Sequence, residues 1–184
     1  MLIVNSEFTP LASPDFESGP PSENAVELSR VVDRGIRESK CIEMEKLAID
    51  AEKVWSIFID IHIINHRGNL IDAAAIAAVA ALHNTKIPKI ENEKILRGDY
   101  QGKLPVVAKP VTVTVCKFGD KIFLDPVLEE EQVLDSKLSI AFREDGYICA
   151  IQKQGSGSIN FSEMEKIVDL AENKSKELRE KLWA

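Results

Sequence analysis

The sequence predicts an α+β fold in which the hairpins of a β-sheet are followed by helices. Apolar residues recur at helical spacing in three segments, and between these segments apolar and polar residues alternate as they do in strands. Two tight-turn dipeptides, in "FGDK" and "REDGY", are typical of β-hairpins. With 184 residues, 45% of them hydrophobic, the chain is long enough to bury one core, so we expect a single domain over residues 1–184.

The first half of the chain is expected to begin with a strand at Leu2–Phe8 and a loop rich in Pro, Ser and Gly. A helix from Asn24 to Ser39 follows, because Asn24 and Glu27 match a capping box ahead of an apolar stripe. Alternating isoleucines then predict a long strand that ends at the turn "HRGN". Asp72 is expected to cap the next helix, which is rich in alanine, has almost no polar face and therefore belongs in the core.

The second half begins with residues 87–110, whose prolines and lack of a steady period predict an irregular connection carrying one or two short strands. The two hairpins come next. The stretch "QGSGS" is expected to be a flexible linker, because glycine and serine favour flexible chain. A last helix, opened by a capping box of Ser162 and Glu165, is predicted to run to about Leu182.

The composition limits the classes of function. A formal net charge of -7 argues against a free-standing nucleic-acid binder, because such proteins neutralise phosphates with an excess of Lys and Arg. Any RNA site must then be local, or be completed by a more basic partner. No apolar run reaches the ~18–20 residues of a membrane span and no signal-peptide pattern is present, so we expect a cytoplasmic protein. Cys41, Cys116 and Cys149 are odd in number and far apart, which predicts buried thiols.

The remaining ionisable residues do not predict a metal or a cofactor. His62 and His66 are four residues apart, a spacing that places two metal ligands side by side on a helix. On the predicted strand the same spacing separates them by ~13 Å. His83 is expected to interact with the negative end of the alanine-rich helix. The carboxylates of Glu129–Glu131 and Asp135 fit either a divalent-cation site or a solvated charged edge, and the edge is the commoner arrangement.

Three arginines share one face of the first helix. Arg30, Arg34 and Arg37 lie within ~60° of one another around the helix axis, roughly opposite its apolar stripe. Planar guanidinium groups bind phosphate through paired hydrogen bonds, which favours an RNA-backbone site. Surface ion pairs are the alternative, and the acidic residues available for them are Glu27, Asp33 and Glu38.

The segment "LSRVVDRGIRES" resembles the helix of the RNase PH family that approaches RNA and phosphate. The resemblance extends through "GNLIDAAAIAAVAALHNTKIPKI" and "LDPVLEEEQVLDSKLSIAF" to the last helix, and it is to the non-catalytic ring subunits of the archaeal exosome in particular. It implies an RNase PH-like βα sandwich of the ribosomal protein S5 domain 2 type. Family members begin with several strands that precede the matched region, so we expect an N-terminally incomplete fold, from a fragment or a late start codon.

The resemblance also implies that the catalytic positions are altered. Active members hold phosphate at a helix N-terminus in a motif like GGTR(S/T)A, and here Asp72 stands in the place of the arginine and Ala73 in that of the hydroxyl residue. A carboxylate and a phosphate ~4 Å apart repel by about 4 kcal/mol at an effective dielectric constant near 20, whereas a helix N-terminus stabilises an anion by only ~0.3–1 kcal/mol. Asp72 is therefore expected to keep phosphate away from the start of this helix. The catalytic aspartate of the family aligns with Lys137.

The resemblance therefore implies a non-catalytic exosome component that pairs with a catalytic RNase PH-like subunit in a ring of three such pairs. Cap subunits that bind RNA and the RNA substrate are its other expected partners, and no membrane is expected. Arg34 and Arg37 are the first candidates for RNA contact and Arg30 is the next. Two interpretations compete with this one. The chain is itself a phosphorolytic exoribonuclease using Asp135 or Glu129–Glu131, or it is a structural ring element without RNA contact.

Overall fold

The protein is described by a computed structural model that covers residues 1–92 and 94–183. Its elements, in chain order, are β1 (Leu2–Phe8), α1 (Glu23–Glu38), the 3-10 helix η1 (Met44–Leu47), β2 (Ile57–Ile63), α2 (Leu70–Asn84), β3 (Lys86–Glu91), β4 (Lys94–Lys103), β5 (Val111–Phe118), β6 (Lys121–Leu124), α3 (Leu128–Glu131), β7 (Ser136–Phe142), β8 (Ile148–Gln154) and α4 (Phe161–Leu182). Helices and mostly antiparallel strands alternate along the chain, so the predicted α+β class is confirmed.

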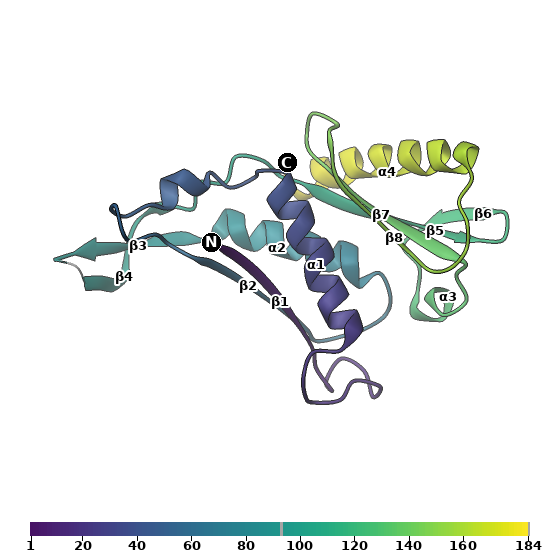
Figure 1. Cartoon of the computed structure of the whole chain (residues 1–184), viewed down its shortest axis with the longest axis horizontal. Coiled ribbons are helices and arrows are strands. Elements are labelled where there is room, and N and C mark those ends of the chain that lie inside the picture. The colour runs from purple at the N-terminus through teal and green to yellow at the C-terminus, as the bar shows by residue number, and fades with distance from the viewer. Residues whose placement is uncertain (93, 184) are drawn as a thin grey trace.

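The first half of the chain packs two helices on one face of a two-stranded parallel sheet (Figure 1). β1 and β2 pair in register from Leu2 opposite Ile57 to Phe8 opposite Ile63. Side chains alternate across this sheet, and the inward ones form a core with α1 and α2. Helix α2 is alanine-rich and therefore approaches its neighbours closely, as its composition predicts.

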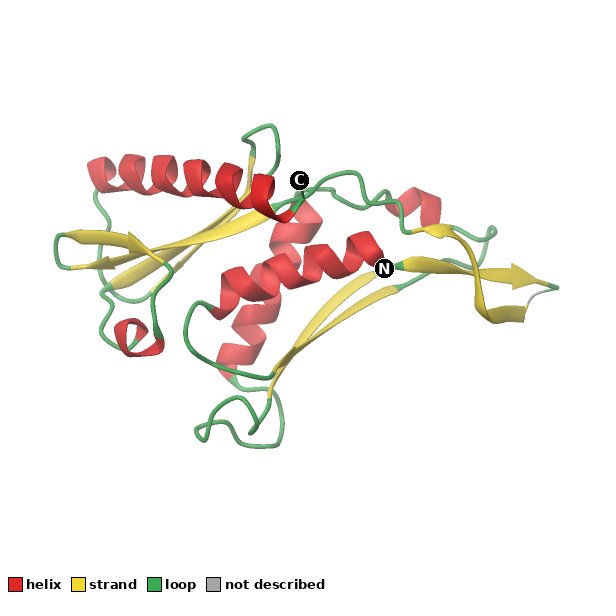
Figure 2. Ribbon diagram, turned by 180° about the vertical axis from the view of Figure 1, so that it is seen from behind, coloured by secondary structure: helices red, strands yellow, loops and turns green. Residues whose placement is uncertain are grey.

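The second half is a four-stranded antiparallel sheet in the order β6-β5-β7-β8, with α4 lying along one face (Figure 2). A second core between α4 and the sheet is centred on Val113, Ile140 and Ile167. The opposite face of the same sheet contacts α1 and α2. These two helices therefore lie between the two sheets, and the candidate site is built where they meet β5, β7 and β8.

Helices α1 and α4 begin at residues other than the expected ones. Ser22 caps α1, accepting a hydrogen bond from the Ala25 backbone N–H at 3.2 Å, because it follows two prolines and has extended backbone angles. Asn24, the cap that the sequence predicts, lies inside the helix instead. Helix α4 is capped by Asn160 and Glu163, whose side chains and backbone N–H groups bond reciprocally.

A β-hairpin occupies most of residues 87–110, where the sequence predicts an irregular connection carrying one or two short strands. β3 and β4 pair from Lys86 opposite Lys103 to Glu91 opposite Lys94, and the register shifts on both sides of Pro88. These shifts remove the regular alternation that would mark a strand in the sequence. Figure 1 shows the hairpin projecting from the body, at the end away from α4.

The segment "QGSGS" is packed and does not form a flexible linker. A Cβ atom at Gly155 would lie 2.6 Å from the Asp135 carbonyl oxygen, and one at Gly157 would lie 2.8 Å from the same atom. The Gly157 N–H donates to this carbonyl at 2.8 Å. The glycines therefore allow close backbone contact here, which composition does not distinguish from flexibility.

The two predicted hairpin turns are confirmed, with Gly119 and Gly146 at positive φ. Cys41 and Cys116 are buried free thiols, and Cys149 is a partly buried one. Within residues 1–92 and 94–183, no helix has both the length and the apolar character that crossing a bilayer requires.

Candidate functional site

The arginine face of α1 borders a groove of about 490 Å³ between this helix and strand β8. The buried side of α1, which includes Leu28, Val32 and Ile36, packs on the core and leaves the arginines exposed. The groove is lined by Pro21, Glu23, Val26, Glu27, Arg30, Val31, Arg34 and Gln152.

Arg34 is held at the edge of this groove by a residue from the other half of the chain. Its Nη1 donates to the Gln152 side-chain oxygen at 2.9 Å. Four of its five N–H groups are left for other acceptors. Arg30 forms no hydrogen bond or ion pair with the residues that the structure describes. Two of the three predicted arginines therefore line one groove with most of their donors available.

Arg37 lies on the same helix but outside the groove. Its Nε and Nη2 donate to the two carboxylate oxygens of Asp33 at 3.0 and 2.7 Å, and Nη2 also donates to the Leu2 carbonyl at 2.9 Å. The hydrogen bonds that Arg37 donates to the Asp33 carboxylate raise the pKa of the Arg37 guanidinium. Only Nη1 has donors left, so Arg37 is less available to an added phosphate than Arg34.

The charges of the groove are balanced. Glu23 and Glu27 line it together with Arg30 and Arg34. The expected alternative for the arginines, an ion pair on the helix surface, is formed in the described part of the chain only between Arg37 and Asp33. Any phosphate bound here is therefore recognised by a few oriented guanidinium groups and not by a broad positive surface.

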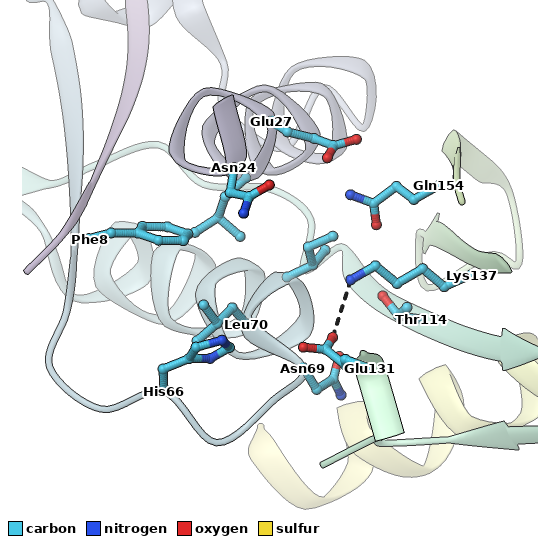
Figure 3. Close-up of a pocket in the computed structure, with 12 residues that line it drawn as sticks. Phe8, Asn24, Glu27, His66, Asn69, Leu70, Thr114, Glu131, Lys137 and Gln154 are labelled. Carbon is cyan, nitrogen blue, oxygen red and sulfur yellow. Dashed lines mark hydrogen bonds and ion pairs between the residues drawn. The ribbon is translucent and has the colours of Figure 1, made fainter. Parts of the chain in front are cut away.

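A second cavity, of about 140 Å³, lies between the beginnings of α1 and α2 and the sheet (Figure 3). Lys137 on β7 reaches into it and pairs with Glu131 of α3, Nζ to Oε1, at 3.2 Å. Both side chains are mostly buried. Asn24, Glu27, His66, Asn69, Thr114 and Gln154 supply the other polar groups around the cavity.

Asp72 is buried beside this cavity but does not line it. Its two carboxylate oxygens accept hydrogen bonds from the Thr114 hydroxyl at 2.7 Å, the Thr114 N–H at 2.9 Å and the Asn69 side-chain amide at 3.2 Å. Burial raises the pKa of the Asp72 carboxyl to about 6, and the hydrogen bonds from Thr114 oppose this increase.

These contacts correct two expectations about Asp72. It is not the cap of α2, because the helix begins at Leu70 and Asn69 takes the cap position with left-handed backbone angles. It is not turned toward an incoming anion either, because its carboxylate is bonded to β5. An anion in the cavity would instead meet Glu131, and Lys137 is already neutralised by that carboxylate. The cavity still disfavours phosphate, for this different reason.

Three of the acidic residues considered for a cation, Glu130, Glu131 and Asp135, are each bonded to a different group. Asp135 accepts a hydrogen bond from the Gly119 N–H at 2.6 Å, and Glu130 accepts one from the Val127 N–H at 2.9 Å. In residues 1–92 and 94–183, no three His, Cys, Asp or Glu side chains converge as metal ligands do.

The three histidines have separate surroundings. His62 on β2 pairs with Glu7 on β1 at 3.2 Å, and His66 stacks on Phe16 with ring centroids 5.4 Å apart. His83 lies in the last turn of α2, as expected, where burial lowers its pKa.

Two residues of the site carry no signal in the sequence. Gln152 and Thr114 belong to strands whose polar positions look like those of any sheet. Their roles depend on the arrangement of the two halves, which brings Arg34 to Gln152 and Asp72 to Thr114.

Comparison with family models assigns both halves of the chain. Residues 1–88 match the model of the 3' exoribonuclease family, domain 1, and residues 109–174 match domain 2 of the same family. The single domain predicted over residues 1–184 is therefore covered by two models, with most of the β3–β4 hairpin between them.

Relatives agree with this assignment over nearly the whole chain. The exosome complex component Rrp42 of Methanocella arvoryzae is 48% identical over 99% of this chain and 69% of its own, and that of Thermococcus gammatolerans is 50% identical over 97% and 67%. A solved Archaeoglobus fulgidus exosome with RNA bound to the active site contains a chain of the same fold, with a TM-score of 0.90 and 46% identity. The match covers 98% of this chain and 70% of that one.

Proposed function

Because the chain belongs to the 3' exoribonuclease family, also called the RNase PH family, we propose that it is a non-catalytic ring component of an archaeal-type exosome. In this role it pairs with a catalytic RNase PH-like subunit, shapes the active site of that subunit and contributes arginines to the path of RNA. Three such pairs form the ring, and cap subunits that bind RNA sit on it. The names of the relatives support the exosome assignment.

The observation that supports a non-catalytic role is the Lys137–Glu131 ion pair. The resemblance implies that the catalytic aspartate of active members aligns with Lys137, and an ammonium group neither binds magnesium nor replaces that carboxylate. Glu131 neutralises Lys137 inside the cavity, so the cavity offers no spare positive charge to phosphate. The two features that active members need for phosphorolysis, a site that attracts phosphate and a catalytic carboxylate, are thus both altered.

The arginine groove supports the RNA-binding part of the proposal. Arg34 and Arg30 line it with free donors, and Arg37 adds its remaining Nη1 donors at the end of the same helix face. Contacts of this kind position an RNA backbone without reading its sequence.

The purified chain alone is expected to release no nucleoside diphosphate from RNA in the presence of phosphate and magnesium. The reason is that Lys137, which the resemblance places at the position of the catalytic aspartate, is paired with Glu131. Product is measured by thin-layer chromatography of labelled RNA, with a catalytic RNase PH-like subunit as the positive control. Phosphate-dependent release that disappears in Asp135→Asn would establish the competing enzyme interpretation.

Replacing Arg34 by alanine is expected to weaken RNA binding by the assembled complex about tenfold, because the variant cannot form a charged hydrogen bond with phosphate. The slope of log affinity against log salt should fall by about 0.7 for each phosphate that the protein no longer neutralises. Arg30→Ala should behave similarly and Arg37→Ala should have a smaller effect, because Asp33 already holds Arg37. Fluorescence anisotropy with labelled oligo(A) RNA over a salt series measures both quantities. Unchanged affinity in the Arg30→Ala, Arg34→Ala double variant would instead support the interpretation that the chain is a structural ring element without RNA contact.

A further inference from the structure

A row of polar side chains spans three neighbouring strands, β5, β7 and β8, of the four-stranded sheet beneath α1 and α2. Thr114 on β5 lies opposite Ser139 on β7, and Ser139 lies opposite Gln152 on β8. The hydroxyl groups of Thr114 and Ser139 are 2.8 Å apart. Thr114 holds Asp72 of α2, and Gln152 holds Arg34 of α1. Each end of the row therefore binds a side chain from one of the two helices.

The Gln152 amide is fixed at both of its ends. Its oxygen accepts from Arg34 Nη1 at 2.9 Å, and its Nε2 donates to the Lys153 carbonyl at 3.2 Å. This assignment leaves the oxygen as the acceptor facing the helix. An exposed arginine side chain otherwise samples many rotamers, and holding one N–H group restricts the directions in which the others point.

We propose that Gln152 is a positioning residue for RNA binding, which orients the Arg34 guanidinium so that its remaining donors face phosphate in the α1–β8 groove. The inference rests on the proposed function, because it assigns the geometry of the same site. Gln152 adds no charge, so its contribution is to the orientation of Arg34 and not to the attraction of RNA.

Gln152→Ala in the assembled complex is expected to weaken binding of oligo(A) RNA about fivefold, because the variant lacks the neutral hydrogen bond that orders Arg34. The salt slope should stay at its original value, since no charge is removed. Gln152→Glu should weaken binding more strongly and lower the slope by about 0.7, because the new carboxylate neutralises Arg34. Gln152→Asn, one methylene shorter, should behave like Gln152→Ala. Gln101→Ala, an exposed glutamine of β4, is the matched control and should bind as the original chain does.

A double-mutant cycle separates this inference from the proposed function. If Gln152 acts only through Arg34, Gln152→Ala should have no further effect in an Arg34→Ala background. Weakening of the double variant below Arg34→Ala, or original affinity of Gln152→Ala where Arg34→Ala binds weakly, would overturn the positioning role alone. Original affinity of Arg34→Ala itself would overturn the arginine site and with it this inference. Thermal unfolding of each variant identifies any that fails to fold. If Gln152→Ala does not fold, Gln152→Asn takes its place in the cycle.

Discussion

Asp72→Ala is expected to be about 2–3 kcal/mol less stable than Asp72→Asn at pH 7, because alanine leaves the buried Thr114 N–H without an acceptor. Asparagine can keep the network. Its oxygen can accept from the Thr114 N–H and the Asn69 amide, while its NH₂ group donates to the Thr114 hydroxyl, which then donates to Ser139. Comparing two uncharged replacements removes the cost of burying the carboxylate from the difference.

Urea unfolding of the two variants, followed by circular dichroism, measures this difference. Ala73→Ser, at the next position on α2, is the control for a change in the first turn of the helix, and Ala73 is exposed. Equal stability of Asp72→Ala and Asp72→Asn would show that the Thr114 contacts contribute nothing to joining α2 to β5.

The same side chain gives a pH dependence of known sign. The pKa of Asp72 is about 6 in the folded chain against an ordinary value of 3.8, so between these values the folded state binds a proton that the unfolded state does not. Its contribution to stability is therefore complete below about pH 4 and is lost as the pH rises through 6. The change is about 3 kcal/mol. The difference in stability between the original chain and Asp72→Asn should show it, and a flat difference from pH 4 to 7 would contradict it.

Periodicity predicts most of the fold because the local signal and the tertiary environment agree. The alternating isoleucines of β2 and the turns at Gly119 and Gly146 lie where the pattern places them. The β3–β4 hairpin looks like an irregular connection in the sequence, since Pro88 breaks both its ladder and its alternation. The prediction of a flexible linker before α4 is also wrong. Glycine occurs both in flexible linkers and where two backbone segments approach closely, and here it allows the close approach.

The candidate site is predictable only in part. The position of the arginines on one exposed helix face follows from their spacing, and it is confirmed. The different hydrogen-bond partners of Arg34 and Arg37 do not follow from this spacing. Arg34 is bonded to a residue 118 positions away, whereas Arg37 is bonded within its own helix and to β1. The burial of Asp72 does not follow from the sequence for the same reason, since its partner Thr114 belongs to the other half of the chain. Whether the three arginines bind RNA stays a prediction.

Gly68→Ala is expected to destabilise the protein by at least about 3 kcal/mol, the largest effect of any substitution proposed for this chain. Gly68 has φ +106°, which residues with a Cβ atom rarely adopt, and a Cβ atom here would lie 2.2 Å from the Pro126 carbonyl oxygen and 2.8 Å from the Val127 carbonyl carbon. Both contacts are with backbone, so no side chain can rotate away, and the loop before α2 must separate from the segment before α3.

Two glycines of β4 serve as matched controls for the two causes. Gly98 has φ +93° and open space around it, so Gly98→Ala measures backbone strain alone, whereas Gly102 has neither positive φ nor a close neighbour and its replacement should be nearly neutral. Thermal unfolding should rank Gly68→Ala well below Gly98→Ala, and Gly102→Ala close to the original chain. Equal losses of stability for Gly68→Ala and Gly98→Ala would mean that the contact with Pro126 is not tight. A tight contact instead makes Gly68 the point that holds α3, and so Glu131, against the cavity where it pairs with Lys137.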